Sequence, residues 1–137
     1  MTMKYVGNRY PVESKKYYTK EEVDALLAGV SYAPMPIVPV VANTVMNTGS
    51  YSGAMVVANS SSPTNITLTI PADATYDFAN GTQISLTGVG TGTVTVAAAS
   101  GVTLLSTPGN KLRTRYSSAT LVKLADNQWL LIGDLSA

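Results

Sequence analysis

The sequence predicts a mainly β protein, with a short N-terminal arm and one short helix followed by a compact antiparallel β-sandwich or barrel-like domain that assembles as a trimer. Three observations favour this fold class. Short runs of alternating apolar and polar residues recur after residue 53, as half-buried strands require. Turn-forming residues separate these runs at close spacing. Charged side chains are instead concentrated before Ala25, where the one clear helical pattern lies.

Composition limits the possible classes of function. The chain has 137 residues, which suits one domain with an extension. It contains no Cys and no His, which excludes disulfides, Cys/His zinc sites and imidazole catalysis. The net charge of +1 predicts no attraction to nucleic acid or to a membrane. We expect no signal peptide, and the prolines within residues 32–42 break the longest apolar run, so it cannot form a transmembrane helix.

Two long tracts, residues 25–72 and 78–110, contain no charged side chain. An enzyme site usually needs titratable groups or a metal to move protons and stabilise charge. We therefore expect a protein without enzymatic activity, catalytic residues, metal or cofactor, whose uncharged surfaces are buried by assembly.

Residues 1–17 form the predicted N-terminal arm. Tyrosines alternate with basic residues here without a clear period. The arm is either flexible, or it docks on a partner with tyrosines as anchors. Under the second interpretation the candidate docking residues are Tyr5, Arg9, Tyr10 and Tyr17.

Residues 18–29 predict a short trimerisation helix. Thr19 is a favourable N-cap, Glu22 completes a capping box, and Gly29 supplies the stop. An apolar stripe at i, i+3 and i+4 follows, formed by Val23, Leu26 and Leu27. So short a helix is marginal alone. The stripe therefore either docks on its own domain or meets two other copies around an axis, and the spacing leaves both alternatives open.

Residues 30–53 predict an extended connector. Pro34, Pro36 and Pro39 are spaced along it, and proline fixes an extended backbone. Its aliphatic residues are too numerous for a solvated linker, so we expect them in a groove of the same or a neighbouring chain. Ile37 and Val40 accordingly join the helix stripe as candidate trimer-interface residues.

Residues 54–137 predict the β domain, or knob. The expected strands are 54–59, 65–70, 82–86, 93–97, 102–105, 119–124 and 128–132. Exposed strand edges normally carry Lys or Pro, which prevent edge-to-edge pairing. Residues 54–70 and 83–102 carry almost none of that protection. This predicts an obligate oligomer independently of the helix.

Few motifs in the β domain suggest chemistry. Residues 88–92 (GVGTG) lack the Lys-Ser/Thr of a phosphate loop and precede a strand, so we expect a hairpin turn. Four aspartates could serve a glycosidase only if a cleft gathered them, and we interpret them as turn carboxylates. They are Asp73, Asp77, Asp126 and Asp134.

Two further features have ordinary structural explanations. Lys111, Arg113 and Arg115 alternate and, with Tyr116, could contact nucleic acid. Three cations are few for such a surface, and a solvated strand face or a pairing with Asp across subunits is the better explanation. Trp129 lies in an apolar strand and is expected in the core rather than on a sugar-binding surface.

Several segments resemble tailed-bacteriophage proteins. GTQISL (81–86), GTGTVTV (90–96), GVTL (101–104), SATLVKL (118–124) and NQWLLIGDL (127–135) resemble a domain recurrent in phage fibre and appendage proteins. KYVGNRY (4–10) is similar to an N-terminal module of phage appendage proteins, although the Trp-containing stretch that usually follows is missing. YTKEEVDALL (18–27) resembles a short helix of trimeric phage tail and fibre proteins.

The resemblance implies a homotrimeric virion protein without an enzymatic site. At this length we favour a capsid head fibre or decoration protein, anchored by its N-terminal arm to the major capsid protein or another virion component. The alternative is a short tail-fibre or baseplate adhesin that binds a host-surface receptor or glycan. An adhesin would present exposed aromatic side chains, for which the candidates are Tyr51, Tyr76, Tyr116 and Trp129.

Overall fold

The computed structural model describes residues 17–28, 33–59 and 64–137. The chain forms two compact units, Met1–Pro34 and Met35–Ala137. The predicted docking residues Tyr5, Arg9 and Tyr10 lie outside the described residues. The predicted mainly β class with one compact domain is confirmed.

The first unit contains the predicted helix, α1 (Lys20–Ala28). The capping box is present: the Glu22 amide donates to Thr19 Oγ1 at 3.1 Å, and the Thr19 amide donates to Glu22 Oε2 at 2.8 Å. Lys20 and Asp24 add an i, i+4 ion pair of 2.6 Å on the surface. Local sequence alone therefore accounts for the start of this helix.

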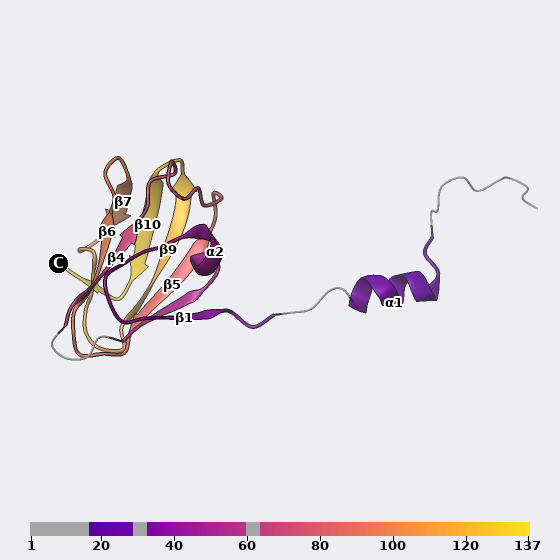
Figure 1. The fold of residues 1–137 in the computed structure, drawn as a ribbon, viewed down its shortest axis with the longest axis horizontal. Coiled ribbons are helices and arrows are strands. Elements are labelled where there is room, and N and C mark those ends of the chain that lie inside the picture. Colours follow the sequence, from indigo (N-terminus) through magenta and orange to yellow (C-terminus); the bar gives the residue numbers. More distant parts are fainter. Residues whose placement is uncertain (1–16, 29–32, 60–63) are drawn as a thin grey trace, which may run out of the picture. The chain divides into compact units, whose positions relative to one another are not determined.

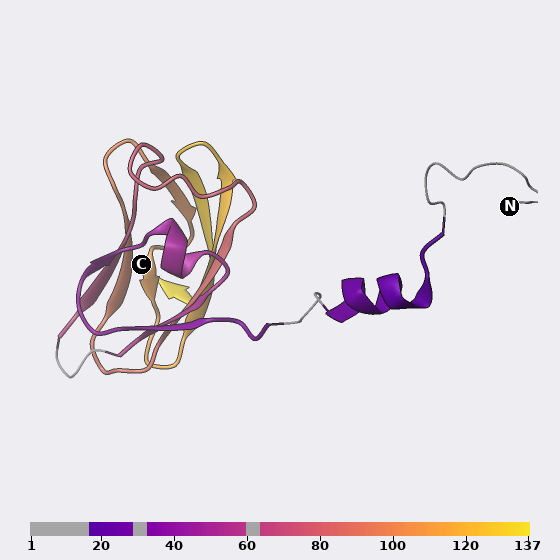
Figure 2. The same ribbon diagram turned by 45° about the vertical axis from the view of Figure 1, so that its right-hand side comes forward.

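The second unit is a sandwich of two sheets that lie face to face (Figures 1 and 2). One sheet has six strands, in the order β1 (Ile37–Val40), β3 (Met55–Ala58), β5 (Gln83–Gly88), β9 (Ser118–Ala125), β10 (Gln128–Gly133), β7 (Thr103–Ser106). The other has five strands, in the order β11 (Leu135–Ser136), β8 (Lys111–Leu112), β6 (Val94–Ala98), β4 (Ile66–Ile70), β2 (Thr44–Val45). All seven predicted strands are present, with ends shifted by a residue or two.

The sheets are mixed rather than antiparallel, which corrects one detail of the predicted fold. From β1 to β9 each successive strand crosses to the opposite sheet. Among β1 to β6, each strand therefore lies beside the strand two positions earlier in the chain and runs in the same direction. The β1–β3, β3–β5, β2–β4 and β4–β6 pairs are parallel for this reason, and β7–β10 is a further parallel pair. Hairpin connections would have produced antiparallel neighbours, and among the strands that the structure describes only β9 and β10 are joined by a hairpin.

The domain begins at Met35 and not at residue 54, so most of the predicted connector belongs to it. Its apolar residues form β1 and β2, which add a strand to each sheet. They lead into a single helical turn, α2 (Thr48–Tyr51), where Asn47 Oδ1 accepts from the Ser50 amide at 2.9 Å. Tyr51 is buried. The groove expected for the connector is therefore the edge of its own sandwich.

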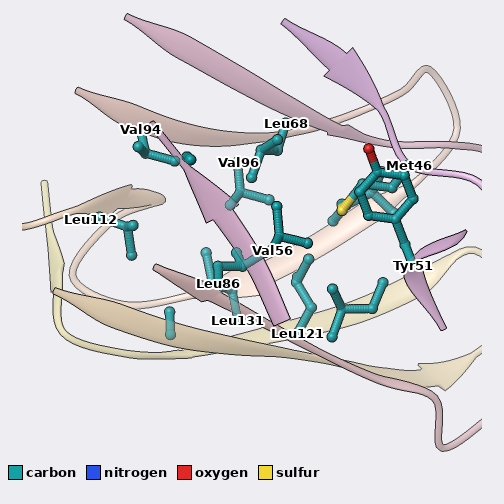
Figure 3. Packing of buried hydrophobic residues seen from close by; sticks show 14 of the residues in the cluster. Met46, Tyr51, Val56, Leu68, Leu86, Val94, Val96, Leu112, Leu121 and Leu131 are labelled. Carbon is teal, nitrogen blue, oxygen red and sulfur yellow. The ribbon is translucent and has the colours of Figure 1, made fainter. Parts of the chain in front are cut away.

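The core lies between the two sheets (Figure 3). Alternation places every second residue inward, as in β4 and β9. Val56, Leu86, Leu121 and Leu131 of the six-stranded sheet face Leu68, Val94 and Val96 of the other (Figure 3). Met46 and Tyr51 lie together at one side of this cluster.

Candidate functional site

The apolar stripe of α1 is exposed. None of the residues of the helix is buried, and Val23, Leu26 and Leu27 are all solvent-accessible. Leu26 also lines a depression of about 340 Å³ with Tyr18, Glu22 and Ala25. Tyr17, the one predicted docking residue within the described part of the chain, is exposed as well. The stripe thus has the accessibility that an inter-chain contact would need.

The two connector residues predicted for the trimer interface differ in accessibility. Ile37 keeps 63% of its surface exposed, whereas Val40 keeps 4% and belongs to the core of its own domain. Both lie on β1, where alternation turns Val38 and Val40 inward and Ile37 and Pro39 outward. Val40 is therefore removed from the candidate interface residues, because its side chain is already packed within its own chain.

The outer face of the six-stranded sheet carries no charged side chain across its central rows. Strand registers place Ile37, Met55, Ser85, Thr120 and Ile132 in one row across five strands. A second row runs through Leu105, Leu130, Val122 and Gln83. Ile37, Leu105 and Ile132 are exposed large apolar residues. The solvent-facing residues of a sheet are usually polar, so the exposed apolar residues make this uncharged face a candidate interaction surface.

Two depressions lie on this face. One, of about 360 Å³, is lined by Met55, Ser85 and Thr120 and reaches Ile132. The other, of about 450 Å³, is lined by Leu105, Leu130 and Ile132. Ile132, near the end of β10, borders both and so connects the two depressions.

The outer face of the five-stranded sheet is threonine-rich. Thr67, Thr95, Lys111 and Ser136 form one row across four strands. Val45, Thr69 and Ala97 form the next. This face is more polar than that of the six-stranded sheet, and Lys111 adds a charge on β8, beside the edge strand β11.

The basic residues near the end of β8 pair within their own chain. Arg113 makes a bidentate contact with Asp134, with Nε to Oδ1 at 2.6 Å and Nη2 to Oδ2 at 2.8 Å. Ser117 donates to the same carboxylate at 2.8 Å. The Arg113 and Ser117 hydrogen bonds hold the pKa of Asp134 below its ordinary value. The partner of Arg113 is an aspartate of the same subunit, not of another.

Arg115 and Tyr116 form an exposed cationic and aromatic pair. Arg115 Nε donates to the carbonyl of Val89 at 2.8 Å, and its guanidinium lies 4.8 Å from the centre of the Tyr116 ring. The backbone of Tyr116 has φ of 70°, which is unusual for a bulky residue. A depression of about 290 Å³ lies between residues 112–115 and the glycine-rich turn that includes Gly90 and Gly92. As expected, a strand, β6, and not a helix follows this turn. The expected hairpin is wrong, because β5 and β6 belong to different sheets.

A buried lysine gathers two of the four candidate aspartates. Lys123 Nζ lies 2.8 Å from Asp73 Oδ1, 3.0 Å from Asp77 Oδ1 and 2.6 Å from the carbonyl oxygen of Phe78. Asp73 is fixed in turn by Asn127: its amide donates to Asn127 Oδ1 at 2.8 Å, and the Asn127 amide donates to Asp73 Oδ2 at 2.9 Å. We call Lys123, Asp73, Asp77 and Asn127 the lysine cluster.

Charge pairing dominates the electrostatics of the lysine cluster. Burial by itself lowers the pKa of Lys123, but the hydrogen bonds and charges of Asp73 and Asp77 outweigh it and the pKa is raised. The hydrogen bond from Lys123 is the main cause of the lowered pKa of Asp73. Sequence reasoning missed this cluster. The sequence did contain an indication of it: the alternation of strand 119–124 places Lys123 inward with Leu121, and a buried lysine needs acidic partners.

The remaining candidate residues are dispersed. Asp126 is exposed in the β9–β10 turn. Tyr51 and Trp129 are buried, which confirms the expected core position of Trp129. Tyr76 and Tyr116 are exposed. Within residues 17–28, 33–59 and 64–137, Asp and Glu do not gather in threes as a metal site would require.

Neither helix in the described parts of the chain is long and apolar enough to span a bilayer. Comparison with protein-family models, with curated proteins and with solved structures finds no match. The geometry of the exposed surfaces is therefore the basis for assigning a function.

Proposed function

We propose that this chain is a non-enzymatic structural protein of a bacteriophage virion, a capsid head fibre or decoration protein that assembles as a homotrimer. The N-terminal arm, with Tyr5, Arg9, Tyr10 and Tyr17, anchors it to the major capsid protein or another virion component. The helix α1 holds three copies together, and the β domain projects as a knob. The protein works without a cofactor.

The observation that carries the proposal is the exposed stripe of α1. Val23, Leu26 and Leu27 lie on one face of the helix and are accessible to solvent. A helix of this length gains its stability from burying such a stripe. Three stripes meeting around an axis would bury all three, each against identical residues of its neighbours.

The uncharged outer face of the six-stranded sheet gives independent support. Ile37, Leu105 and Ile132 are exposed there, across rows of residues that carry no charge. Contact between knobs, or with the virion surface, would cover these residues. Stable interfaces are depleted of charge at their centre in the same way.

The proposal is tested on phage particles whose genome encodes the chain. Purified particles should contain the full chain by mass spectrometry, and an antibody against the β domain should label the capsid in electron micrographs. Label at the tail tip would favour the adhesin instead. Absence of the chain from intact particles would refute a virion role.

A second candidate, a tail-fibre or baseplate adhesin for a host-surface glycan, is favoured by Tyr116 and Arg115. Their side chains form an exposed aromatic and cationic pair next to a depression, and sugar rings commonly pack on exposed aromatic side chains. Binding to a glycan array that Tyr116→Ala abolishes and Tyr76→Ala preserves would support the adhesin. If the protein binds no glycan on the array, the adhesin function is refuted for these glycans.

A further inference from the structure

We propose that the lysine cluster forms an intramolecular isopeptide bond, in which Lys123 Nζ becomes joined to the side-chain carbonyl carbon, Cγ, of Asp73, with Asp77 as the proton carrier. This would be a self-catalysed covalent cross-link between β9 and the segment that follows β4. It is independent of the proposed virion role.

Contact between the reacting groups is the first argument. Lys123 Nζ lies 2.8 Å from Asp73 Oδ1 although the two residues are 50 positions apart in the chain. Reacting groups held at about 3–3.5 Å gain effective molarities of about 10⁵–10⁸ M. The fold therefore holds Nζ against the carboxylate whose carbon, Cγ, is bonded to Oδ1, a proximity that free side chains lack.

Exclusion of water is the second argument. The Lys123 side chain is 1% exposed and that of Asp73 17%. Trp129 lies directly opposite Lys123 in the β9–β10 register and also faces the core. Phe78, whose carbonyl accepts from Nζ, packs edge-on against the Trp129 ring at 5.3 Å between centroids. An amide buried in such an aromatic environment would be protected from hydrolysis.

Asp73 and Asp77 differ in exposure, which suits one to be the reacting carboxylate and the other to be the proton carrier. Asp77 contacts Nζ at 3.0 Å, but its side chain is 76% exposed, so it can exchange protons with solvent. Asp73 is less exposed, and the Asn127 amide holds its Oδ2 at 2.9 Å. This N–H is placed to stabilise the negative charge that develops on Oδ2 when the carboxyl carbon is attacked.

The reaction balances without an external reactant. Lys123 gives one ammonium proton to Asp77, and the freed Nζ lone pair attacks Cγ of the Asp73 carboxylate, which leaves negative charge on both Oδ1 and Oδ2. A second proton from Nζ and the proton returned by Asp77 then pass to Oδ1, which leaves as water. The Nζ–Cγ bond forms, the Cγ–Oδ1 bond breaks, and one ammonium and one carboxylate become an amide and a water molecule.

Ion pairing opposes this chemistry by keeping the reactants charged. The raised pKa of Lys123 and the lowered pKa of Asp73 both favour the ionised forms. The proton transfer to Asp77 is therefore the step that limits the rate, and the bond forms after folding rather than during it. This gives Asp77 a kinetic role that can be measured.

The test is the intact mass of the full wild-type chain, kept folded at neutral pH until its mass no longer changes and then denatured. The mass should be one water molecule below that calculated from the sequence. Lys123→Arg keeps the cation but should retain its full calculated mass, which controls for processing of the N-terminus. A wild-type chain that keeps its full mass would overturn the proposal.

Peptide mapping assigns the bond. Trypsin should fail to cleave after Lys123, and one product should join the peptides that contain residues 73 and 123. Chymotrypsin, cleaving after Tyr76, separates Asp73 from Asp77. A bond to Asp77 would refute the assigned roles.

Two variants test the chemistry. Asp73→Asn should lose ammonia instead of water and reach the same final mass as the linked wild type. Asp77→Asn should form the bond at least tenfold more slowly after refolding. An unchanged rate in Asp77→Asn would remove the proton-carrier role.

Discussion

Replacing Leu26 by Asp tests whether the exposed stripe of α1 holds the trimer together. The change places a carboxylate in the middle of the stripe formed by Val23, Leu26 and Leu27. In a single chain it should have little effect on the β domain, which is a separate compact unit. In a trimer each of the three copies carries the change, so the loss of free energy of assembly per chain counts three times.

The magnitude follows from the exposure of the side chain. Leu26 is 59% exposed in the single chain, and full burial of a leucine stabilises by about 1.5–3 kcal/mol. Burying the remaining surface therefore contributes roughly 0.9–1.8 kcal/mol per chain, or about 3–5 kcal/mol for three chains. At about 1.4 kcal/mol per tenfold change, Leu26→Asp should raise the overall dissociation constant at least about 100-fold. Desolvation of the new carboxylate adds to this.

Sedimentation equilibrium over a dilution series measures the effect directly. The matched control is Ala28→Asp, which adds the same charge at an exposed position that does not share the face of Leu26, and it should leave the dissociation constant within a few fold. If both variants assemble as the wild type does, the stripe is not an inter-chain core. If both weaken assembly equally, general charge repulsion and not stripe burial is responsible.

Three further predictions concern the β domain. Gly133→Ala should reduce the free energy of unfolding by roughly 1–3 kcal/mol in urea titrations, because φ is +146° and a Cβ would lie 2.5 Å from Ala119 Cα; an unchanged midpoint would contradict the strained geometry. Compared with wild type refolded freshly, before the proposed bond forms, Lys123→Met should lower the free energy of unfolding by roughly 1–3 kcal/mol, because the buried partner of Asp73 is lost; equal or higher stability would show that the lysine cluster does not stabilise the fold. The pKa of Asp134 is lowered from 3.8. Its ionised form therefore adds to the free energy of unfolding above pH 3.8, and this contribution is lost as the pH falls through the depressed pKa. The melting temperature of the wild type should thus exceed that of Asp134→Asn at neutral pH and converge with it in acid, and a gap that persists in acid would contradict this.

Local signals in the sequence predicted the local structure well. The capping box of Thr19 and Glu22 depends on residues three apart, and both of its hydrogen bonds are present. The strand at 65–70 follows from strict alternation, and β4 buries Ile66, Leu68 and Ile70. Such patterns report which residues face inward, and they need no knowledge of the partner strand.

Strand pairing and the lysine cluster were not predictable in the same way. Alternation predicts a strand but not the sheet that the strand joins. The sequence therefore did not predict that the chain crosses between the sheets, which makes β3 and β5 parallel neighbours. Val40 was taken for an interface residue because its run looked too apolar for a linker, and β1 buries it in its own chain. The contact of Lys123 with Asp73 joins positions 50 apart, a separation that no local pattern encodes.

The central claim is that this chain functions as a homotrimer. Multi-angle light scattering of the full wild-type chain, purified and diluted to low micromolar concentration, tests it most directly. The account predicts a single species with three times the 14.3 kDa mass of the chain. A stable monomer at every concentration would contradict it, because the stripe of α1 would then remain exposed to water.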